Sequence, residues 1–140
     1  MPHSIEFRVR YAETDQMGVV HHSVYFVWFE QLRTEYFRVL EIPYGELESR
    51  GVFFPVVETG CRYKGGARYD GLVRITGWLR PPKGVRVRLD YTVEQEGRLL
   101  VEGYTIHARM GSKGRSGKIP GALIRKFEQE ASPHSVGPKF

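Results

Sequence analysis

Asp15 is the side chain best placed for chemistry. It lies in residues 12–20, which follow a strand-like stretch and precede a helical pattern that opens near Ser23. The first turn of a helix leaves backbone N–H groups without partners, and these groups and the helix dipole favour negative charge. A carboxylate there can act as a nucleophile or as a general base toward water. The structural alternative is a loop carboxylate that accepts hydrogen bonds from nearby backbone N–H groups.

Four other polar side chains have a chemical and a structural interpretation. Tyr25 either points its hydroxyl into a site near Asp15 or continues the apolar face of the helix. Glu30 lies opposite that face by helical phase, which favours a solvent or interface role. Glu58 is a second candidate acid, and we expect it to form a buried salt bridge with an arginine. His107 is expected to be a structural histidine with satisfied hydrogen bonds.

Metal and phosphate-loop chemistry are disfavoured by spacing. The five histidines and the single cysteine, Cys61, form no HExxH or CxxC pattern, and one cysteine cannot form an intrachain disulfide. Residues 111–118 resemble a phosphate-binding P-loop. However, the spacing between the outer glycines is one residue too long, and Ile119 replaces the Ser or Thr that would meet magnesium. We therefore expect no metal site.

The net charge of +5 is unevenly distributed. Residues 1–50 hold five basic and eight acidic side chains, whereas residues 62–88 hold eight basic side chains against Asp70 alone. Such asymmetry is typical of a surface that meets an anionic partner, by focusing positive potential on it. Nucleic acid, a membrane surface and a phosphate-bearing cofactor all fit that description, and a solvated basic face is the structural alternative.

The residues on either side of Asp15 predict a strand and a long helix. Residues 5–11 alternate apolar and charged side chains, as in a half-buried strand. Residues 23–40 have the helical period, with Ser23 as the expected N-cap and Pro43 as a stop signal. The apolar face of this helix is formed by Tyr25, Trp28, Phe29, Leu32, Tyr36, Val39 and Leu40.

The rest of the chain reads mostly as strand. The patterns predict strands over residues 52–64, 72–79, 85–93 and 99–110, then a short helix over 122–131. An apolar sheet face and one aromatic helix can bury their apolar surfaces against each other, which predicts an α+β fold with a sheet wrapped around the helix. We expect one domain over residues 1–131 and a disordered tail over 132–140. Exposed sheet edges favour pairing with a second subunit.

The sequence lacks the apolar segments that direct a protein to or across a membrane. The first fifteen residues have no apolar signal-peptide core, and no stretch approaches the roughly 18 apolar residues of a membrane-spanning helix. A cytoplasmic enzyme or binding protein is the expectation.

Residues 9–37, VRYAETDQMGVVHHSVYFVWFEQLRTEYF, resemble the signature of the 4-hydroxybenzoyl-CoA thioesterase-like family of hotdog-fold proteins. The signature consists of a strand end, an aspartate with a glycine three positions on, two small apolar residues, and His or aromatic residues that open the helix. Here its residues are Asp15, Gly18, Val19, Val20, His21, His22 and Tyr25. Residues 62–70 resemble the exit of the family's second strand, although Gly66 stands where many relatives have proline.

The resemblance implies hydrolysis of an acyl-CoA thioester without a cofactor, since coenzyme A is part of the substrate. By resemblance, Asp15 is the nucleophile or general base, and the backbone N–H of His22 is the oxyanion donor. The His22 imidazole either orients water or substrate or serves only for its backbone. His21 is expected to be structural.

The resemblance also implies how the substrate is held. Gly18 and Val20 belong to the signature loop at the substrate. Tyr25, Trp28 and Val57 are expected to line the acyl pocket with help from a partner subunit, and their size favours short, branched or aromatic acyl groups. Lys64 and Arg68 are expected to hold the phosphates of coenzyme A. The implied assembly is a homodimer with sites at the subunit interface, paired further as a dimer of dimers (a homotetramer). These expected binding residues are Gly18, Val20, Tyr25, Trp28, Val57, Lys64 and Arg68.

Two other functions remain as alternatives. One is a hotdog hydratase or dehydratase, in which a histidine would abstract the proton; the acidic residue seven positions before the oxyanion donor favours hydrolysis. The other is a non-catalytic protein that binds acyl-CoA or nucleic acid. No RNP-like, helix-turn-helix or zinc-finger pattern accompanies the basic charge, so we expect no nucleic-acid partner.

Overall fold

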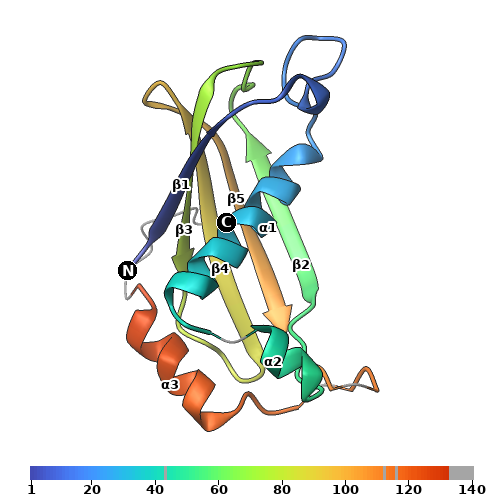
Figure 1. Ribbon diagram of the computed structural model, residues 1–140, viewed down its shortest axis with the longest axis vertical. Helices are drawn as coiled ribbons and strands as arrows, with labels where there is room; N and C mark the ends of the chain where they lie inside the picture. Colours follow the sequence, from blue (N-terminus) through green and yellow to red (C-terminus); the bar gives the residue numbers. More distant parts are fainter. Residues whose placement is uncertain (43, 112, 116, 133–140) are drawn as a thin grey trace.

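The computed structural model describes residues 1–42, 44–111, 113–115 and 117–132. Five antiparallel strands form one sheet in the order β1-β3-β4-β5-β2. Helix α1 lies across one face of the sheet, while α2 and α3 lie near one end of the molecule (Figure 1). The elements are β1 (His3–Arg8), the 3-10 helix η1 (Tyr11–Glu13), α1 (Val24–Val39), α2 (Tyr44–Ser49), β2 (Val56–Tyr63), β3 (Leu72–Leu79), β4 (Arg86–Gln95), β5 (Arg98–Ala108) and α3 (Gly121–Glu130).

Helix α1 is held by its aromatic face, as its sequence period predicts for most positions. Its buried side chains are Tyr25, Trp28, Phe29, Leu32, Tyr36 and Phe37. Val39 was expected on this face but is 63% exposed in the last turn, where Phe37 packs on the core instead. The ring of Phe29 stacks on that of Tyr91 in β4, with centroids 4.3 Å apart and planes within 9°. Burying each such side chain contributes roughly 1.5–3 kcal/mol. The packing of this one face on the sheet fixes the direction in which α1 presents its N-terminus.

Two glycines in the sheet let α1 approach closely. A Cβ atom at Gly103 in β5 would lie 2.5 Å from a ring carbon of Phe29, and one at Gly77 in β3 would lie 2.3 Å from a methyl carbon of Leu32. Side chains at these positions would push the helix away from the sheet. The depth at which α1 sits therefore depends on both glycines.

Several predicted boundaries need correction. Ser23 precedes α1, but its hydroxyl bonds Nδ1 of His21 at 2.8 Å and makes no cap hydrogen bond. The first strand ends at Arg8, and Tyr11 belongs to η1. The strand expected over 52–64 begins only at Val56, because Pro55 offers no N–H to a ladder. Helix α2 was not predicted, because it is short and buries no residue fully.

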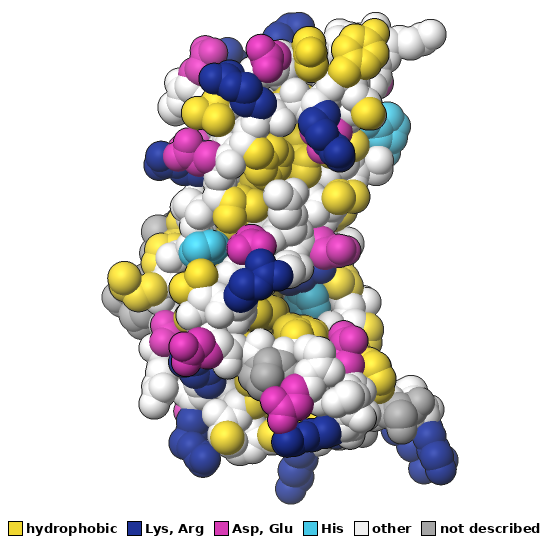
Figure 2. All heavy atoms as spheres, viewed as in Figure 1, with side chains coloured by type: hydrophobic (Ala, Val, Ile, Leu, Met, Phe, Trp, Pro, Cys, Tyr) yellow, Lys and Arg dark blue, Asp and Glu magenta, His cyan; other side chains and the backbone are white. Residues whose placement is uncertain are grey.

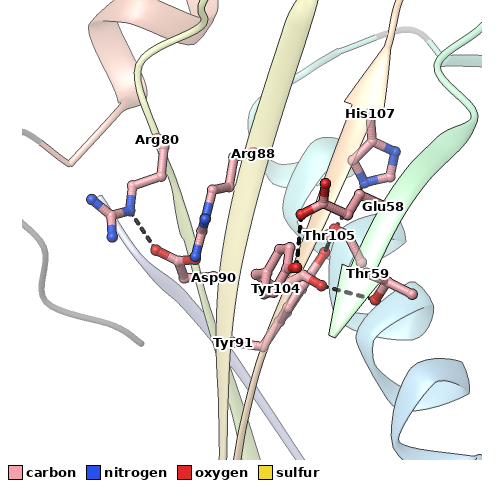
Figure 3. Close-up of polar contacts among 9 residues, drawn as sticks. All are labelled: Glu58, Thr59, Arg80, Arg88, Asp90, Tyr91, Tyr104, Thr105 and His107. Atoms are coloured by element: carbon pink, nitrogen blue, oxygen red, sulfur yellow. Dashed lines mark hydrogen bonds and ion pairs between the residues drawn. The ribbon is translucent and has the colours of Figure 1, made fainter. Parts of the chain in front are cut away.

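The outer face of the sheet contains a buried carboxylate. Asp90 in β4 is 0% exposed although the alternation in its strand points it outward. It accepts hydrogen bonds from Arg80 and from Nε of Arg88, the latter at 2.8 Å (Figure 3). These two arginines compensate the charge that burial would otherwise make costly.

Glu58 has a different partner from the one expected. It is exposed in β2, and its Oε2 accepts a hydrogen bond of 2.7 Å from the hydroxyl of Tyr104 in β5 (Figure 3). The expected buried salt bridge is therefore wrong, because the edge position of β2 leaves this side chain in solvent. We assign Glu58 no catalytic role.

The end of the described chain packs on the core. Helix α3 buries Leu123 and Phe127, and the Phe127 ring contacts Phe37 and Phe54. The short helix expected over residues 122–131 is thus confirmed. Pro43 and residues 133–140 of the tail expected to be disordered lie outside the described residues. Ser132, the first residue of that expected tail, is buried, and its N–H donates to the Leu79 carbonyl at 2.8 Å. In the described part of the chain, no helix is both long enough and apolar enough to cross a membrane.

Candidate functional site

The Asp15 loop is closed by its own backbone. Asp15 N–H donates to the carbonyl of Val19 at 2.9 Å, and Thr14 and Val20 form an isolated β-bridge. Gly18 turns the chain with φ of +79°, a conformation that glycine adopts at little cost. One carboxylate oxygen of Asp15, Oδ1, accepts the Met17 N–H at 2.9 Å. The expected structural interaction therefore exists, and it occupies only one of the two carboxylate oxygens.

The helix start next to this loop has a free donor. His21 N–H donates to the carbonyl of Glu13 at 2.9 Å, and Val24 N–H donates to the carbonyl of His21 at 3.0 Å. Between them, the N–H of His22 has no acceptor among the residues that the structure describes. The carbonyl in the same peptide unit, that of His21, accepts the Val24 N–H, and the His22 carbonyl of the next unit accepts the hydroxyl of Tyr63 at 2.9 Å, so the peptide units on both sides of His22 are held. An exposed N–H directly before a helix of 16 residues is suited to bind a developing oxyanion.

Tyr25 lies beneath the loop rather than open to solvent. It is 1% exposed, and its hydroxyl accepts the Ala67 N–H at 3.2 Å. Burial raises the pKa of this hydroxyl, and the nearby carboxylate of Asp15 adds a smaller increase. The hydroxyl thus remains protonated at neutral pH, close to Asp15, and it ties α1 to the segment after β2.

The imidazoles of the two histidines differ in their contacts. His21 bonds Ser23 through Nδ1, which agrees with a structural role. The ring of His22 is exposed and makes no hydrogen bond to any described residue; it lies edge-on to Tyr63, with centroids 6.5 Å apart. Its imidazole is free to meet substrate, and whether it does so stays a prediction.

Glu13 is the positioning residue that sequence reasoning missed. It is 7% exposed, and its carboxylate accepts the backbone N–H of Arg10 at 2.8 Å and the indole N–H of Trp28 at 2.7 Å. It therefore anchors the Asp15 loop to the core face of α1. The signal available in the sequence was the need of a buried tryptophan for an acceptor, with Glu13 as a nearby carboxylate.

The expected substrate-binding residues separate into three groups. Val20 and Trp28 are buried in the core, 4% and 1% exposed, and support the loop from below. Gly18 is exposed in the loop itself. Val57 lies near the opposite end of β2 from Tyr63, roughly 20 Å away at about 3.3 Å per residue. Within one chain, Val57 is therefore not brought to the Asp15 loop.

The two expected phosphate ligands also differ. Arg68 forms an isolated β-bridge with Val19, so it borders the loop directly, and its guanidinium has no partner among the described residues. Lys64 is exposed, but its ammonium pairs with Glu102 at 3.2 Å. Arg68 is therefore the better placed cation for an anion at this site.

A second feature is a cavity of about 610 Å³ at the other end of α1. It lies between the C-terminal half of α1, α2 and the start of β2. Its lining includes Glu30, Arg33, Tyr44, Phe54, Val56 and His107. Glu30 is thus an exposed residue at a cavity rim, in line with the expected solvent or interface role.

Two remaining candidates are inert at neutral pH. Burial lowers the pKa of His107 to about 4, and both ring nitrogens are bonded, Nδ1 to the Phe54 carbonyl and Nε2 to Thr105, each at 2.9 Å. The expected structural role of His107 is confirmed. Burial raises the pKa of the Cys61 thiol to about 11, which makes it a poor nucleophile. Within the described residues, no three His, Cys, Asp or Glu side chains cluster as metal ligands would.

Comparison with known proteins agrees with this arrangement. Residues 9–131 match the model of the thioesterase-like superfamily. YneP of Bacillus subtilis (strain 168), named as a candidate acyl-CoA thioesterase, is 35% identical over 103 residues, which cover 73% of this chain and 75% of YneP. The acyl-CoA thioester hydrolase YbgC of Escherichia coli O6:H1 is 28% identical over 124 residues, covering 87% of this chain and 92% of YbgC.

A solved structure shows the same fold. The DHNA-CoA thioesterase of Staphylococcus aureus superposes with a TM-score of 0.85 at 26% identity, covering 91% of this chain and 89% of that one. The superfamily match spans the Asp15 loop, α1, the four strands β2 to β5 and α3. The chain therefore belongs to the thioesterase-like superfamily, a family of thioester hydrolases with the hotdog fold.

Proposed function

We propose that this protein hydrolyses acyl-CoA to a free acid and coenzyme A at the loop between β1 and α1. The observation that carries the proposal is the free N–H of His22 at the start of α1, directly after the backbone-closed loop that holds the carboxylate of Asp15. In this proposal the thioester carbonyl oxygen accepts the His22 N–H. An oxyanion donor of this kind contributes roughly 10²–10³ in rate.

The chemistry follows from these two groups. As general base, Asp15 takes a proton from a water molecule whose oxygen attacks the thioester carbon. The tetrahedral oxyanion then collapses, the C–S bond breaks, and the thiolate of coenzyme A leaves and takes up the proton. As nucleophile, the carboxylate would attack the carbon itself, break the C–S bond, expel the thiolate of coenzyme A and form an anhydride, which water then hydrolyses to the free acid and the Asp15 carboxylate. Both routes use the same donor, and both remain open.

Arg68 and Lys64 are proposed to meet the phosphates of coenzyme A. Arg68 borders the loop through its bridge to Val19, and its guanidinium has no partner among the described residues. A guanidinium can bind a phosphate with two parallel hydrogen bonds. Lys64 would have to leave Glu102, so we assign it the smaller contribution.

The substrate is proposed to carry a short, branched or aromatic acyl group. Two similar structures are those of thioesterases named for aromatic acyl groups, the DHNA-CoA thioesterase of Staphylococcus aureus and the BH1999 gentisyl-coenzyme A thioesterase, which is 25% identical. This similarity supports the aromatic option for this chain. A cytoplasmic location stays a prediction from the sequence.

We propose further that the working unit is a homodimer joined along β2. This strand is an edge of the sheet, and Val56 and Val57 on it are each 43% exposed. Exposed hydrophobic side chains also lie between charged ones on the face that carries α1 (Figure 2). Unpaired strand edges and apolar side chains favour association with a second copy. Further pairing into a dimer of dimers stays a prediction.

Symmetry explains why Val57 lies far from Asp15 in one chain. The Tyr63 end of β2 lies at His22, and the Val56 end lies at the cavity. If two β2 edges pair antiparallel about a twofold axis, the Val57 end of one chain lies beside His22 of the other. The acyl pocket would then combine residues of both copies.

The test is thiol release from a panel of short, branched, aromatic and long acyl-CoAs. We expect hydrolysis of at least one class, and a loss of roughly 10²–10⁴ in kcat for Asp15→Asn. The matched control is Asp70→Asn, an exposed loop carboxylate with φ of +63°, which asparagine tolerates. Full activity of Asp15→Asn, or no thiol release from any substrate, would contradict the proposal. Hydration of an enoyl-CoA without thiol release would favour the hydratase alternative.

A further inference from the structure

Arg33 is a half-buried cation without a counter-ion. It projects from the middle of α1 toward the cavity of about 610 Å³. Among the described residues its hydrogen-bond partner is neutral: a guanidinium nitrogen donates to the hydroxyl of Tyr91 at 3.3 Å. It forms no ion pair with any carboxylate of the described residues. A guanidinium carries five N–H donors, so several donors face the cavity with no acceptor.

A chain of hydrogen bonds behind Arg33 fixes its direction. The carbonyl of Phe54 can only accept, so Nδ1 of His107 carries the proton and Nε2 accepts from the hydroxyl of Thr105. The Thr105 oxygen, 2.7 Å from the Tyr91 oxygen, then accepts from Tyr91, whose own oxygen accepts from Arg33. Figure 3 shows Tyr91, Thr105 and His107 in this sequence across β4 and β5.

The hydrogen-bonded side chains behind Arg33 have no free acceptor for its remaining donors. Burial keeps His107 neutral, since its pKa is lowered to about 4, so the chain holds a single orientation at neutral pH. The cavity therefore presents the Arg33 donors beside the apolar side chains of Phe37, Ile42 and Phe54, and its lining also holds the carboxylates of Glu30 and Glu48, neither of which pairs with Arg33. Such a wall fits a ligand with an apolar body and an oxygen acceptor at its end.

The cavity is too far from His22 of its own chain to receive an acyl group bound there. Arg33 lies eleven residues after His22, about 16 Å along the helix at 1.5 Å per residue. In the proposed homodimer, however, the Val56 end of one β2, which lines the cavity, lies beside His22 of the other copy. The cavity of one subunit then opens toward the thioester site of its partner.

We propose that Arg33 selects acyl groups that carry an oxygen acceptor at the end remote from the thioester, bound at the site of the other subunit. This inference rests on the proposed thioesterase function and its dimer. The acceptor is a carboxylate or a neutral hydroxyl oxygen, and each replaces the partner that Arg33 lacks within its own chain. Methyl-tipped acyl groups of the same shape leave the Arg33 donors buried and unpaired, which is unfavourable.

Two isosteric substrate pairs test the selection. Succinyl-CoA is compared with 4-methylpentanoyl-CoA, and 4-hydroxybenzoyl-CoA with 4-methylbenzoyl-CoA. The first pair probes a carboxylate and the second a neutral oxygen. We expect kcat/KM of the wild-type protein to favour the oxygen-tipped member of at least one pair roughly ten- to hundredfold. Equal values in both pairs would overturn the inference, while thiol release from the methyl-tipped members would leave the thioesterase proposal standing.

The variant Arg33→Met assigns the preference to its residue. In this variant we expect the two substrates of a pair to have about equal kcat/KM. The kcat/KM of the oxygen-tipped substrate should fall, while hydrolysis of the methyl-tipped substrate is retained. Tyr91→Phe removes the hydroxyl that orients Arg33 without deleting the cation, and should give a partial loss. The matched control is Arg74→Met. Arg74 is an exposed arginine on β3 that pairs with Glu6 on β1. A preference retained in both Arg33→Met and Tyr91→Phe would overturn the inference.

Mixed dimers test which subunit supplies Arg33. Differently tagged Asp15→Asn and Arg33→Met chains are coexpressed, and dimers that carry both tags are purified. One site of such a dimer combines Asp15 of the Arg33→Met chain with Arg33 of the Asp15→Asn chain. We expect this site to restore the wild-type preference at about half the wild-type rate per dimer. If the mixed dimer shows the same preference as the Arg33→Met homodimer, or if the wild-type protein is a monomer, the placement of Arg33 across the interface is overturned.

Discussion

Glu13 holds the Asp15 loop to the core through two hydrogen bonds that need a carboxylate. Both hydrogen-bond partners, the Arg10 backbone N–H and the Trp28 indole N–H, are donors, and the Arg10 guanidinium adds an ion pair at 3.5 Å. A glutamine here would present an NH₂ group to one of them. Because the group is buried, we expect Glu13→Gln to cost about 1–3 kcal/mol of the free energy of unfolding and to lower kcat more than it raises KM.

Denaturant unfolding and steady-state kinetics measure these two effects. Trp28→Phe removes the indole donor, so the double variant Glu13→Gln/Trp28→Phe should lose less stability than the sum of the two single variants. Strict additivity would show that the Glu13–Trp28 hydrogen bond does not anchor the loop.

The peptide of His22 and its imidazole can be separated by two substitutions. His22→Ala keeps the backbone N–H, whereas His22→Pro removes it. Since the imidazole bonds none of the described residues while the N–H stands free at the start of α1, we expect the alanine variant to stay within about tenfold of wild-type kcat/KM, by the scale of a lost contact. The proline variant should lose roughly 10²–10³ in kcat. Thiol-release kinetics on folded variants give both values, and an inactive alanine variant would assign chemistry to the ring.

His107 makes stability depend on pH. Its pKa is about 4 in the folded protein, below the ordinary value of 6.5, so the unfolded chain binds more protons between these values. Stability from this group is therefore present above pH 6.5 and is lost as the pH falls toward 4. We expect a loss of about 2 kcal/mol between pH 7 and pH 5 from His107. Urea unfolding at both pH values should show a smaller loss for His107→Gln, and equal losses would contradict this origin.

At the scale of elements, Gly103 sets the depth of α1 on the sheet. A methyl group there would lie 2.5 Å from a ring carbon of Phe29 and 3.0 Å from the Gly60 carbonyl oxygen. We expect Gly103→Ala to cost about 1–3 kcal/mol, because the core is already filled. Gly45→Ala in α2 is the matched control: nothing lies within 4 Å of its added methyl, and alanine favours helix by about 0.5–1 kcal/mol. Thermal unfolding distinguishes the two, and similar midpoints would argue against close packing at Gly103.

The elements that the sequence predicted are those with a local pattern. The strand pattern of residues 72–79 and the aromatic face of α1 depend on neighbours a few positions apart, and the strand and most of that face agree with the structure. The site residues that escaped prediction depend on long-range contacts. Glu13 bonds a tryptophan fifteen positions on, and Arg33 bonds Tyr91 across the core. Periodicity carries no information about such partners, and Glu58 was misjudged for the same reason.

For the whole molecule, the proposed dimer makes the free edge of β2 the part on which a complete site depends. Val57 lies on that edge and is 43% exposed. An aspartate there would place a charge in the proposed apolar interface of two copies, which opposes association. We therefore expect Val57→Asp to remain folded, to sediment as a monomer and to lose thioesterase activity in parallel. Leu72→Asp is the matched control, since Leu72 is 44% exposed but lies on β3, between β1 and β4.

Sedimentation equilibrium and thiol release on the same samples give the two measurements. Raising the protein concentration should restore dimer and activity together, because association follows mass action. A Val57→Asp monomer with full activity would show that one chain holds the whole site, and the partner's cavity would then have no part in acyl binding. Loss of activity in a Val57→Asp protein that is still dimeric would instead place Val57 itself against the acyl group. Parallel recovery is the outcome that a site shared between two copies requires, because Asp15 and Val57 lie toward opposite ends of each chain.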